Sequence, residues 1–463
     1  MSSKRPANTA DLARREFLRR AALVGGTGAA APWALNLALL GEAAAQSAPG
    51  DYKALVCIFL YGGCDHGNTF VPVDAGNYAA YANIRTGIAL EQAALLPTEL
   101  QPVAALPGGM RLALAPELAP VKPLWDSGRL AVQLNIGPLA VPTTKAQYEA
   151  RSVPLPPKLF SHNDQQSVWQ SGLPEGATSG WGGRIGDLML SGNGGSVFTC
   201  VSVTGNAVYL SGRTAVQYQI SSNGAVAING ISRALNGSAA AQQALRTLIT
   251  RPSAQLFEDE VTRITRRSID AEARVTAALS SGPALTTAFA SNSLANQLKM
   301  VARLIASRSQ LGVGRQVFLV SQGGYDLHDN LLDNQPGLLA ALGGAMRSFH
   351  DATVELGVAD RVTSFTASDF GRTLSSNGDG SDHGWGSHHL LMGAALKGRR
   401  FYGQAPAIAV NGPDDVGQGR LLPTTSVYQF GATLARWFGV SETDLPLVVP
   451  GIVNFSNRDI GFL

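Results

Sequence analysis

Three of the chain's seven histidines lie in one nine-residue stretch, SDHGWGSHH at 381–389, which also contains an aspartate. Three more stand in glycine-rich or polar segments: His66 in GGCDHGN, His162 in FSHND and His328 in GGYDLHDN. Only His350 lies outside such a segment. Imidazole nitrogens and carboxylate oxygens are ligands of divalent metal ions. The distribution therefore predicts metal-assisted chemistry.

Four apolar runs are predicted to be buried parallel strands, and they would position these residues. They are rich in Val, Ile, Leu and Phe without clean alternation, and each ends at glycine or polar residues. The runs are KALVCIFLYGG at 53–63, LAVQLNIG at 130–137, RQVFLVSQGG at 315–324 and RVTSFTASDFG at 361–371. A helical pattern at 335–357 separates the last two, which is a β-α-β order. We expect an α/β fold with a largely parallel sheet and helices on both faces.

Ligands of open α/β sheets gather outside the carboxyl ends of the strands. The carboxylate and imidazole residues that follow the predicted strands are Asp65, His66, Asp326, His328, Asp369, Asp382, His383, His388 and His389. Each group alone is also explained by helix capping or a turn. Because three strand ends each deliver a carboxylate, the sequence predicts a site for one or two divalent ions, namely zinc, manganese, magnesium or calcium.

The stretch 381–389 is predicted to form a tight site loop. Gly384 and Gly386 lack a Cβ and can adopt positive φ, which would bring His388 back beside His383. Trp385 is expected to pack as a lid over the turn, and the residue after His388 to have a supporting role. The alternative is a rigid surface turn whose histidines bind only backbone groups.

Signatures of other functions are absent from the sequence. It has no G-x-S-x-G, P-loop or H-E-x-x-H pattern, and no G-x-G-x-x-G after a strand of the mature chain. It also lacks a basic run with interleaved aromatics, so we expect no nucleic acid partner. Arg372, in DFGRT, is a candidate for neutralising an anionic substrate, with a plain surface arginine as the alternative.

Residues 1–45 are predicted to be an export signal. A basic segment precedes AALVGGTGAAAPWALNLALL, and Arg14 and Arg15, followed by Phe17 and Leu18, resemble the twin-arginine motif. We expect a periplasmic or extracellular protein with the twin-arginine translocase as its partner during export. No membrane span is expected after cleavage. An N-terminal membrane anchor is the alternative, which the glycines and proline of this segment disfavour.

Residues 46–463 are long enough for one large α/β domain with an insertion, or for two moderate domains. The interval 176–232 alternates polar and β-branched residues, which predicts short strands and hairpins. The interval 238–309 has helical periodicity. We expect an insertion at about 190–310 that supports or covers the site.

Five segments carry a resemblance to a known family. They are YGGCDHGNTFVP, LFSHNDQQSVWQSG, GWGGRIGD, GGYDLHDN and SDFGRTLSSNGDGSDHGWGSHHLLMGAALKG. Over about residues 52–462 they resemble the secreted bacterial family named domain of unknown function 1501. That family is grouped with the alkaline phosphatase superfamily, which includes phosphatases, sulfatases and phosphodiesterases. The resemblance implies an alkaline phosphatase-like core with metal ligands at strand ends.

The metal ligands that the resemblance implies are Asp65, Asp326, His328, Asp369, Asp382, His383 and His388. The superfamily usually separates the residues that correspond to Asp326 and His328 more widely, and its last histidine lies further along. The resemblance also implies a nucleophile at a helix start. Ser161 fits this role, with His162 beside it, although it could be only a helix cap. Thr69 is a second candidate.

We therefore expect an exported, metal-dependent hydrolase of phosphate or sulfate esters, acting on a small anionic ester or a polymer. Its catalytic residues would be Ser161, His162 and Arg372. The alternative is a catalytically silent, exported binding or assembly protein that keeps the metal-site frame for structure.

Overall fold

The computed structural model describes residues 52–463, so the predicted export signal lies outside the described residues. The central sheet has nine strands: β1 Lys53–Leu60, β4 Leu130–Gly137, β5 Cys200–Ser202, β6 Tyr218–Gln219, β7 Arg315–Gln322, β8 Val362–Ser368, β11 Ser387–Met392, β12 Phe401–Tyr402 and β13 Thr425–Ser426. Their order is β12-β4-β11-β8-β1-β7-β5-β6, with β13 also paired to β4. Only β11 runs antiparallel to its neighbours within this sheet. The predicted α/β class with a mainly parallel sheet is confirmed, as are the four predicted strands β1, β4, β7 and β8.

Thirteen α-helices accompany the sheet within residues 52–463. They are α3 Ala75–Ile84, α4 Gln92–Leu95, α5 Lys122–Asp126, α6 Lys145–Glu149, α7 His162–Ser171, α8 Trp181–Met189, α9 Ala239–Thr250, α10 Leu256–Ser281, α11 Ser293–Ala306, α12 Arg308–Leu311, α13 Leu331–Glu355, α14 Val427–Phe438 and α15 Leu445–Val448. Two small antiparallel sheets of two strands each complete the fold: β2 Phe70–Pro72 with β3 Leu112–Leu114, and β9 Arg372–Ser376 with β10 Ser381–His383. No helix in this part of the chain is long and apolar enough to cross a bilayer.

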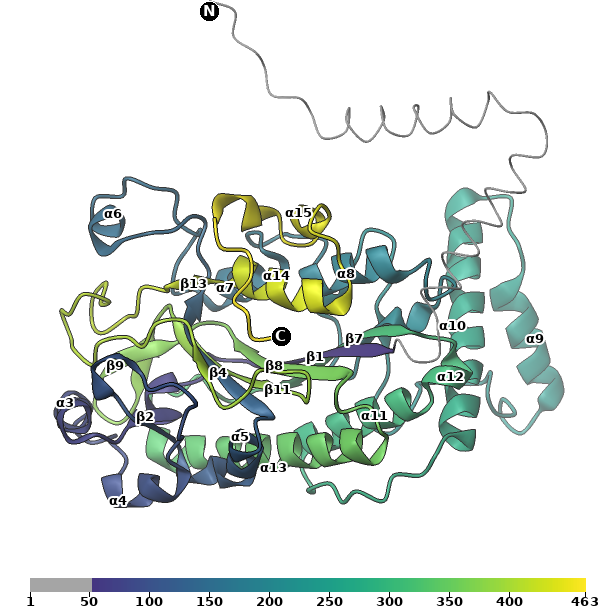
Figure 1. The fold of residues 1–463 in the computed structure, drawn as a ribbon. Coiled ribbons are helices and arrows are strands. Elements are labelled where there is room, and N and C mark those ends of the chain that lie inside the picture. Colours follow the sequence, from purple (N-terminus) through teal and green to yellow (C-terminus); the bar gives the residue numbers. More distant parts are fainter. Residues whose placement is uncertain (1–51) are drawn as a thin grey trace, which may run out of the picture. The chain divides into compact units, whose positions relative to one another are not determined.

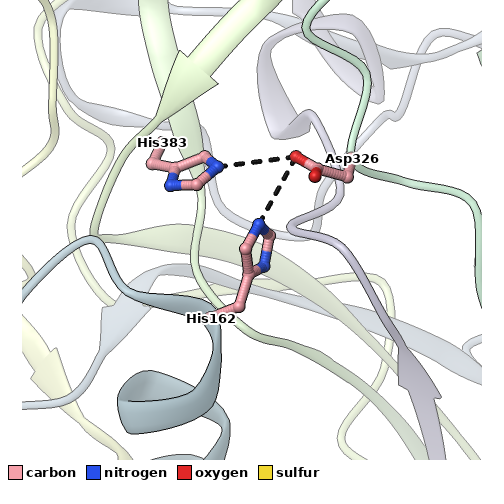
Figure 2. A group of neighbouring side chains, drawn as sticks. All are labelled: His162, Asp326 and His383. Carbon is pink, nitrogen blue, oxygen red and sulfur yellow. Dashed lines mark ion pairs between the residues drawn. The ribbon is translucent and has the colours of Figure 1, made fainter.

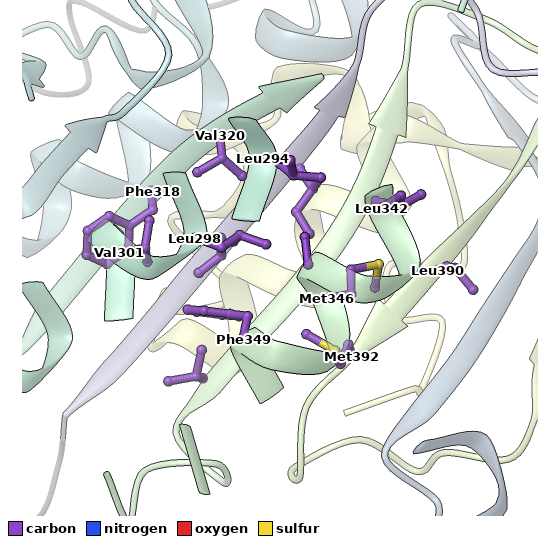
Figure 3. Close-up of a cluster of buried hydrophobic side chains, with 14 of the residues drawn as sticks. Leu294, Leu298, Val301, Phe318, Val320, Leu342, Met346, Phe349, Leu390 and Met392 are labelled. Atoms are coloured by element: carbon purple, nitrogen blue, oxygen red, sulfur yellow. The ribbon is translucent and has the colours of Figure 1, made fainter. Parts of the chain in front are cut away.

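Helices cover both faces of the sheet, which explains why its strands lack alternation. Val56 and Ile58 of β1 belong to a core shared with α11 and α13, part of which is drawn in Figure 3. Leu55 and Cys57 face a second core shared with α8 and α14, which lie on the other side of the sheet (Figure 1). Successive side chains of a strand point to opposite faces. With an apolar core on each side, β1 is apolar at every position after Lys53.

The interval 176–232 differs from its prediction. It contains α8, and its strands β5 and β6 extend the main sheet in parallel instead of forming hairpins. Trp181 and Ile185 of α8 are one helical turn apart and both are buried, so this face of the helix packs on the sheet. The helical prediction for 238–309 is confirmed by α9, α10 and α11.

Candidate metal centre

The three central strands end at the same level of the sheet. Leu60, the last residue of β1, is in register with Gln322 of β7 and Ser368 of β8. The loops that follow therefore start side by side. Gly62 has φ +113°, and a Cβ there would lie 2.4 Å from the backbone nitrogen of Asp326. Only glycine allows the loops after β1 and β7 to approach this closely.

Two imidazoles converge on one carboxylate at this edge (Figure 2). Nε2 of His162 lies 3.4 Å from Oδ1 of Asp326, and Nε2 of His383 lies 3.5 Å from the same oxygen. His162 begins α7, Asp326 lies in the loop after β7, and His383 ends β10. The three ligand atoms all lie within 4.8 Å of one another, as residues that share a metal ion must.

His328 brings a third imidazole to the same carboxylate. Its Nε2 is 3.2 Å from Oδ1 of Asp326 and 2.9 Å from Nε2 of His383. The structure thus places His162, assigned from the sequence to catalysis, among the predicted ligands Asp326, His328 and His383.

All three rings are held through Nδ1, their other nitrogen. The pairs are His162 with Oδ2 of Asp369 at 2.6 Å, His328 with Oδ1 of Asp382 at 3.0 Å, and His383 with the carbonyl oxygen of Phe160 at 2.8 Å. A neutral imidazole that donates from Nδ1 keeps its lone pair on Nε2. In that state all three lone pairs face Asp326, and Nε2 of His162 is buried without a hydrogen-bond partner among residues 52–463. Metal-binding histidines are held in this way.

Arg372 supplies positive charge to the same group. It is buried, and its guanidinium donates to Oδ1 of Asp326 and, at 3.3 Å, to Nε2 of His328. Its other N–H groups donate to backbone carbonyls, including those of Gly63 and Ser381, both at 2.9 Å. With its donors used inside the protein, Arg372 positions Asp326. These contacts do not support the predicted role of meeting the substrate.

The charge states favour ionised Asp326 and neutral His383. Burial raises the pKa of Asp326, but the hydrogen bond and charge of Arg372 outweigh it, so the net pKa lies below its usual value. Burial lowers the pKa of His383, and the charge of Arg372 adds to this effect. The hydrogen bond to Asp369 raises the pKa of His162, so a proton competes with a metal ion for its Nε2.

The separations and the donor types both fit one metal ion. Ligand atoms held at about 2.0 to 2.1 Å from a tetrahedral ion lie about 3.3 Å apart, close to the 3.2 to 3.5 Å between the Nε2 atoms and Oδ1 of Asp326. The ligand atoms that all lie close to one another come from His162, His383 and Asp326. Two imidazoles and one carboxylate favour zinc or another first-row ion over magnesium and calcium, which prefer oxygen ligands. Arg372 is the cation with which such an ion would compete.

Asp369 and Asp382 lie behind the rings. Oδ2 of fully buried Asp369 accepts the Nδ1 hydrogen bond of His162 together with bonds from the backbone N–H of Gly62 at 3.1 Å and the amide of Gln166 at 2.8 Å. These partners make Asp369 a support for His162. Asp382, predicted as a ligand, instead orients His328.

Asp65 has a different set of partners. It is buried, and Oδ2 accepts from Arg85 at 2.7 Å and from the hydroxyl of Ser381, while Oδ1 accepts from the backbone N–H of Asn68 at 2.8 Å. Burial raises its pKa, but the charge of Arg85 and the hydrogen bonds from Ser381 and Arg85 outweigh that, so the net pKa lies below its usual value. The Asp65 carboxylate is thus paired with Arg85, away from the imidazoles around Asp326.

The His388 side chain is buried inside the protein. Residues 387–392 form β11, so the chain extends from Ser387 onward. Nδ1 of His388 accepts from the backbone N–H of Asn135 at 3.1 Å, and its ring lies 4.9 Å from that of His66. His389 contacts other groups, with its ring edge-on to Trp169 at 5.1 Å, as the alternation of a strand requires.

The glycines of 381–389 serve close packing. Gly384 and Gly386 do not adopt positive φ, so that prediction is wrong. A Cβ on Gly384 would lie 2.4 Å from the carbonyl oxygen of Gly371, and one on Gly386 would lie 2.1 Å from Oδ1 of Asn135. Trp385 is also not a lid: it is fully buried in the core and donates from Nε1 to the carbonyl of Pro138 at 2.7 Å.

The residues before α7 contribute a group that the sequence did not reveal. Phe160 has φ +70°, a costly conformation for a bulky side chain, and its carbonyl holds His383. Because a backbone oxygen does this work, no residue type signals it. Ser161 follows as the N-cap of α7, with its Oγ donating to Oδ2 of Asp164 at 2.8 Å.

Comparison with solved structures finds distant similarity to a protein of known structure. Two crystal structures of Ps i-CgsB match, one of the protein and one of its complex with k-i-k-neocarrahexaose. Each is 10% identical, and the alignment covers 88% of this chain and 77% of that chain, with TM-scores of 0.37 and 0.34. At these scores the likeness carries no argument.

Comparison with curated proteins finds no match. Among protein-family models, residues 52–446 match the family described as "Protein of unknown function (DUF1501)". The matched range includes every residue of the candidate metal centre described above. The chain therefore belongs to the DUF1501 family, as its sequence motifs predicted.

Proposed function

We propose that this protein is an exported, metal-dependent hydrolase of phosphate or sulfate esters built on an alkaline phosphatase-like core. The observation that carries the proposal is the set of three imidazoles whose Nε2 atoms turn toward the Asp326 carboxylate. This set lies at the carboxyl edge of parallel strands, where ligands of α/β sheets bind. A metal ion bound there would polarise an ester oxygen and stabilise negative charge.

The residues around the ligands hold them in place. Asp369 and Asp382 fix the rings of His162 and His328 through Nδ1, and Arg372 fixes the carboxylate of Asp326. Ligands that are already oriented lose little freedom when an ion binds.

Ser161 is the proposed nucleophile. It stands at the start of the ten-residue helix α7, where free N–H groups and the helix dipole favour a phosphate or sulfate group. Its Oγ donates to buried Asp164, which is placed to accept the proton as Oγ attacks the ester's phosphorus or sulfur. The bond from that atom to the ester's alcohol oxygen breaks, and the alcohol leaves with a proton from water. A second water molecule then hydrolyses the ester on Ser161, which releases phosphate or sulfate and returns the proton to Oγ. Thr69 is disfavoured because it is buried and donates to the carbonyl of Asp65.

Metal content and turnover of the purified full chain test the proposal. We expect about one divalent ion per chain and cleavage of p-nitrophenyl phosphate or p-nitrophenyl sulfate. Ser161→Ala should abolish turnover and keep the metal, because Ser161 is not among the ligands. A protein without bound metal after reconstitution with zinc or manganese would contradict the proposal.

One observation favours a second candidate, a catalytically silent binding or assembly protein. The guanidinium of Arg372 already contacts Oδ1 of Asp326 and Nε2 of His328, where a cation would bind. In this case Arg372 would serve in place of a metal and the site would be structural. A folded protein that shows no turnover across panels of phosphate and sulfate esters, with or without bound metal, would support this second function.

Export is the remaining part of the proposal. Arg14 and Arg15 lie outside the described residues, and their place in the twin-arginine pattern is its support. Replacing both by lysine should keep the protein in the cytoplasm, as measured by fractionation. Mature protein outside the cytoplasm in that variant would contradict this route.

A further inference from the structure

Exposed apolar side chains gather in one short segment of the chain. Within residues 52–463, eight of the fifteen large hydrophobic side chains that are exposed come from residues 216–264. They are Val216, Val226, Ile228, Leu248, Leu256, Phe257, Val261 and Ile264. Single exposed apolar residues are ordinary, but a concentrated group marks a binding surface.

The centre of this surface is a stripe along α10. Phe257, Val261 and Ile264 have the i, i+4, i+7 spacing that places side chains on one helix face. Phe257 is 86% exposed and neighbouring Leu256 is 80% exposed, whereas Ile269 is buried on the other side of α10. The helix therefore has two apolar faces, and only one of them packs on its own chain.

Grooves extend the surface on both sides of the stripe. The space between α9 and α10 is lined by Leu248, Phe257 and Val261. The space between β6 and α10 is lined by Tyr218 and Ile264. Figure 1 shows α9 and α10 at the opposite end of the sheet from β9, whose first residue, Arg372, contacts the metal centre.

The charges along α10 indicate what covers the stripe. The acidic residues Glu258, Asp259 and Glu260 come first, and the basic residues Arg263, Arg266 and Arg267 follow. If two copies of α10 lie antiparallel, the acidic segment of each helix meets the basic segment of the other. Glu260 and Arg267 lie on the same side of the stripe, 3.3 Å apart within one chain. Residues on that side face each other in an antiparallel pair, so Glu260 of each copy would meet Arg267 of the other.

We propose that this end of the molecule is a self-association surface, through which two copies of the chain pair by antiparallel α10 helices around a twofold axis. A twofold interface uses the same patch on both copies, so the patch must be complementary to itself, and the charge order of α10 satisfies this condition. An anionic membrane is a poorer occupant because the acidic residues adjoin the most exposed apolar ones, Leu256 and Phe257. The proposal does not depend on the metal centre or on ester hydrolysis.

The first test measures the mass of the purified full chain by sedimentation equilibrium over a range of concentrations. We expect a dimer, and we expect Phe257→Asp to raise its dissociation constant at least tenfold because it buries a carboxylate in the interface. Val103→Asp is the matched control, since Val103 is 59% exposed outside the patch. Thermal melting checks that each variant is folded. A wild-type chain that stays monomeric, or a dimer that is unchanged by Phe257→Asp, would overturn the proposal.

The second test uses charge reversal to establish the antiparallel geometry. Glu260→Arg and Arg267→Glu should each weaken self-association, because like charges then meet across the interface. An equal mixture of the two variants should form a heterodimer. The Glu260→Arg variant carries positive charge at positions 260 and 267, and the Arg267→Glu variant carries negative charge at both. Each contact between the two copies therefore joins opposite charges. The broken pair within each chain is not repaired by mixing, so restored association reports the contact between copies. No heterodimer in the mixture, or binding to phosphatidylglycerol vesicles by a monomeric wild type, would overturn the proposal.

Discussion

The protein contains two groups of three histidines with opposite surroundings. The open histidine group consists of His162, His328 and His383, and the buried histidine group consists of His66, His388 and His389. In the open group every ring is partly exposed, and every Nδ1 lies beside an oxygen acceptor. In the buried group the rings are almost excluded from solvent, and Nδ1 of His388 accepts from a backbone N–H.

Burial keeps the histidines of the buried group neutral, but it does not make that group a metal site. It lowers the pKa of His66 to about 4 and those of His388 and His389 to about 3, so all three are neutral at physiological pH. A neutral imidazole is necessary for metal binding, but its free nitrogen must also face other ligands. The open group therefore differs from the buried group in the partner of Nδ1 and in a shared carboxylate, and these two features make it the candidate metal site.

The largest expected effect concerns the carboxylate shared by the open group. Asp326→Asn removes the negative charge from the point where three imidazoles and Arg372 meet, so bound metal and ester turnover should each fall at least about 100-fold. Metal is measured by mass spectrometry and turnover with p-nitrophenyl esters. Asp333→Asn, an exposed change on α13, is the control. Unchanged metal content in Asp326→Asn would show that the open group does not bind an ion.

The next effect tests the role of the Nδ1 partner. Asp369→Asn leaves the side-chain shape but removes the charge that holds Nδ1 of His162, so metal affinity should fall about 10- to 100-fold. Competition with a chelator measures this affinity. His389→Phe alters the buried group and should leave metal affinity unchanged. If the two variants lose affinity equally, the open and buried groups are not functionally distinct.

The fold was predictable because strands that are buried on both faces of a sheet have continuous apolar sequences. β1 is apolar from Ala54 to Leu60 and β7 from Val317 to Val320, without the alternation of half-exposed strands. The interval 176–232 was harder to predict, since α8 carries Gly182, Gly183 and Gly186, which disfavour a helix by propensity. A Cβ on Gly183 would lie 2.2 Å from the backbone of Ser211, so packing overrides propensity at that position.

The site was predictable only as a set of candidates. Strand ends identified Asp326, His328 and His383, because sheet topology places those ends together. The sequence does not tell a ligand from its support: Asp369 and Asp382 have the same chemistry as Asp326, and only their positions behind the rings distinguish them. The carbonyl of Phe160 has no side-chain signature at all.

The buried group predicts a loss of stability in acid. Its pKa values in the folded state lie below the usual 6.5, so the unfolded chain binds more protons than the folded chain as the pH falls from about 6.5 toward 4. Stability is thus complete above pH 6.5 and falls by about 1.4 kcal/mol per pH unit for each such histidine. His389→Phe should reduce this slope by about one histidine's share, as measured by urea unfolding at several pH values. An unchanged slope would show that His389 is protonated in the folded state.

The smallest effect separates the two carboxylates that support the open group. Asp382 is 41% exposed, whereas Asp369 is fully buried, so solvent screens the charge of Asp382 more strongly. Its Oδ1 also accepts from the amide of Asn377 at 3.0 Å, which keeps this side chain in place. In Asp382→Asn the new amide oxygen can still accept from Nδ1 of His328, so metal affinity should fall no more than about tenfold. The same chelator competition compares it with Asp369→Asn on an identical scale. If Asp382→Asn loses more metal affinity than Asp369→Asn, burial of the supporting carboxylate does not determine metal affinity. The charge beside His328 would then matter more than the charge beside His162.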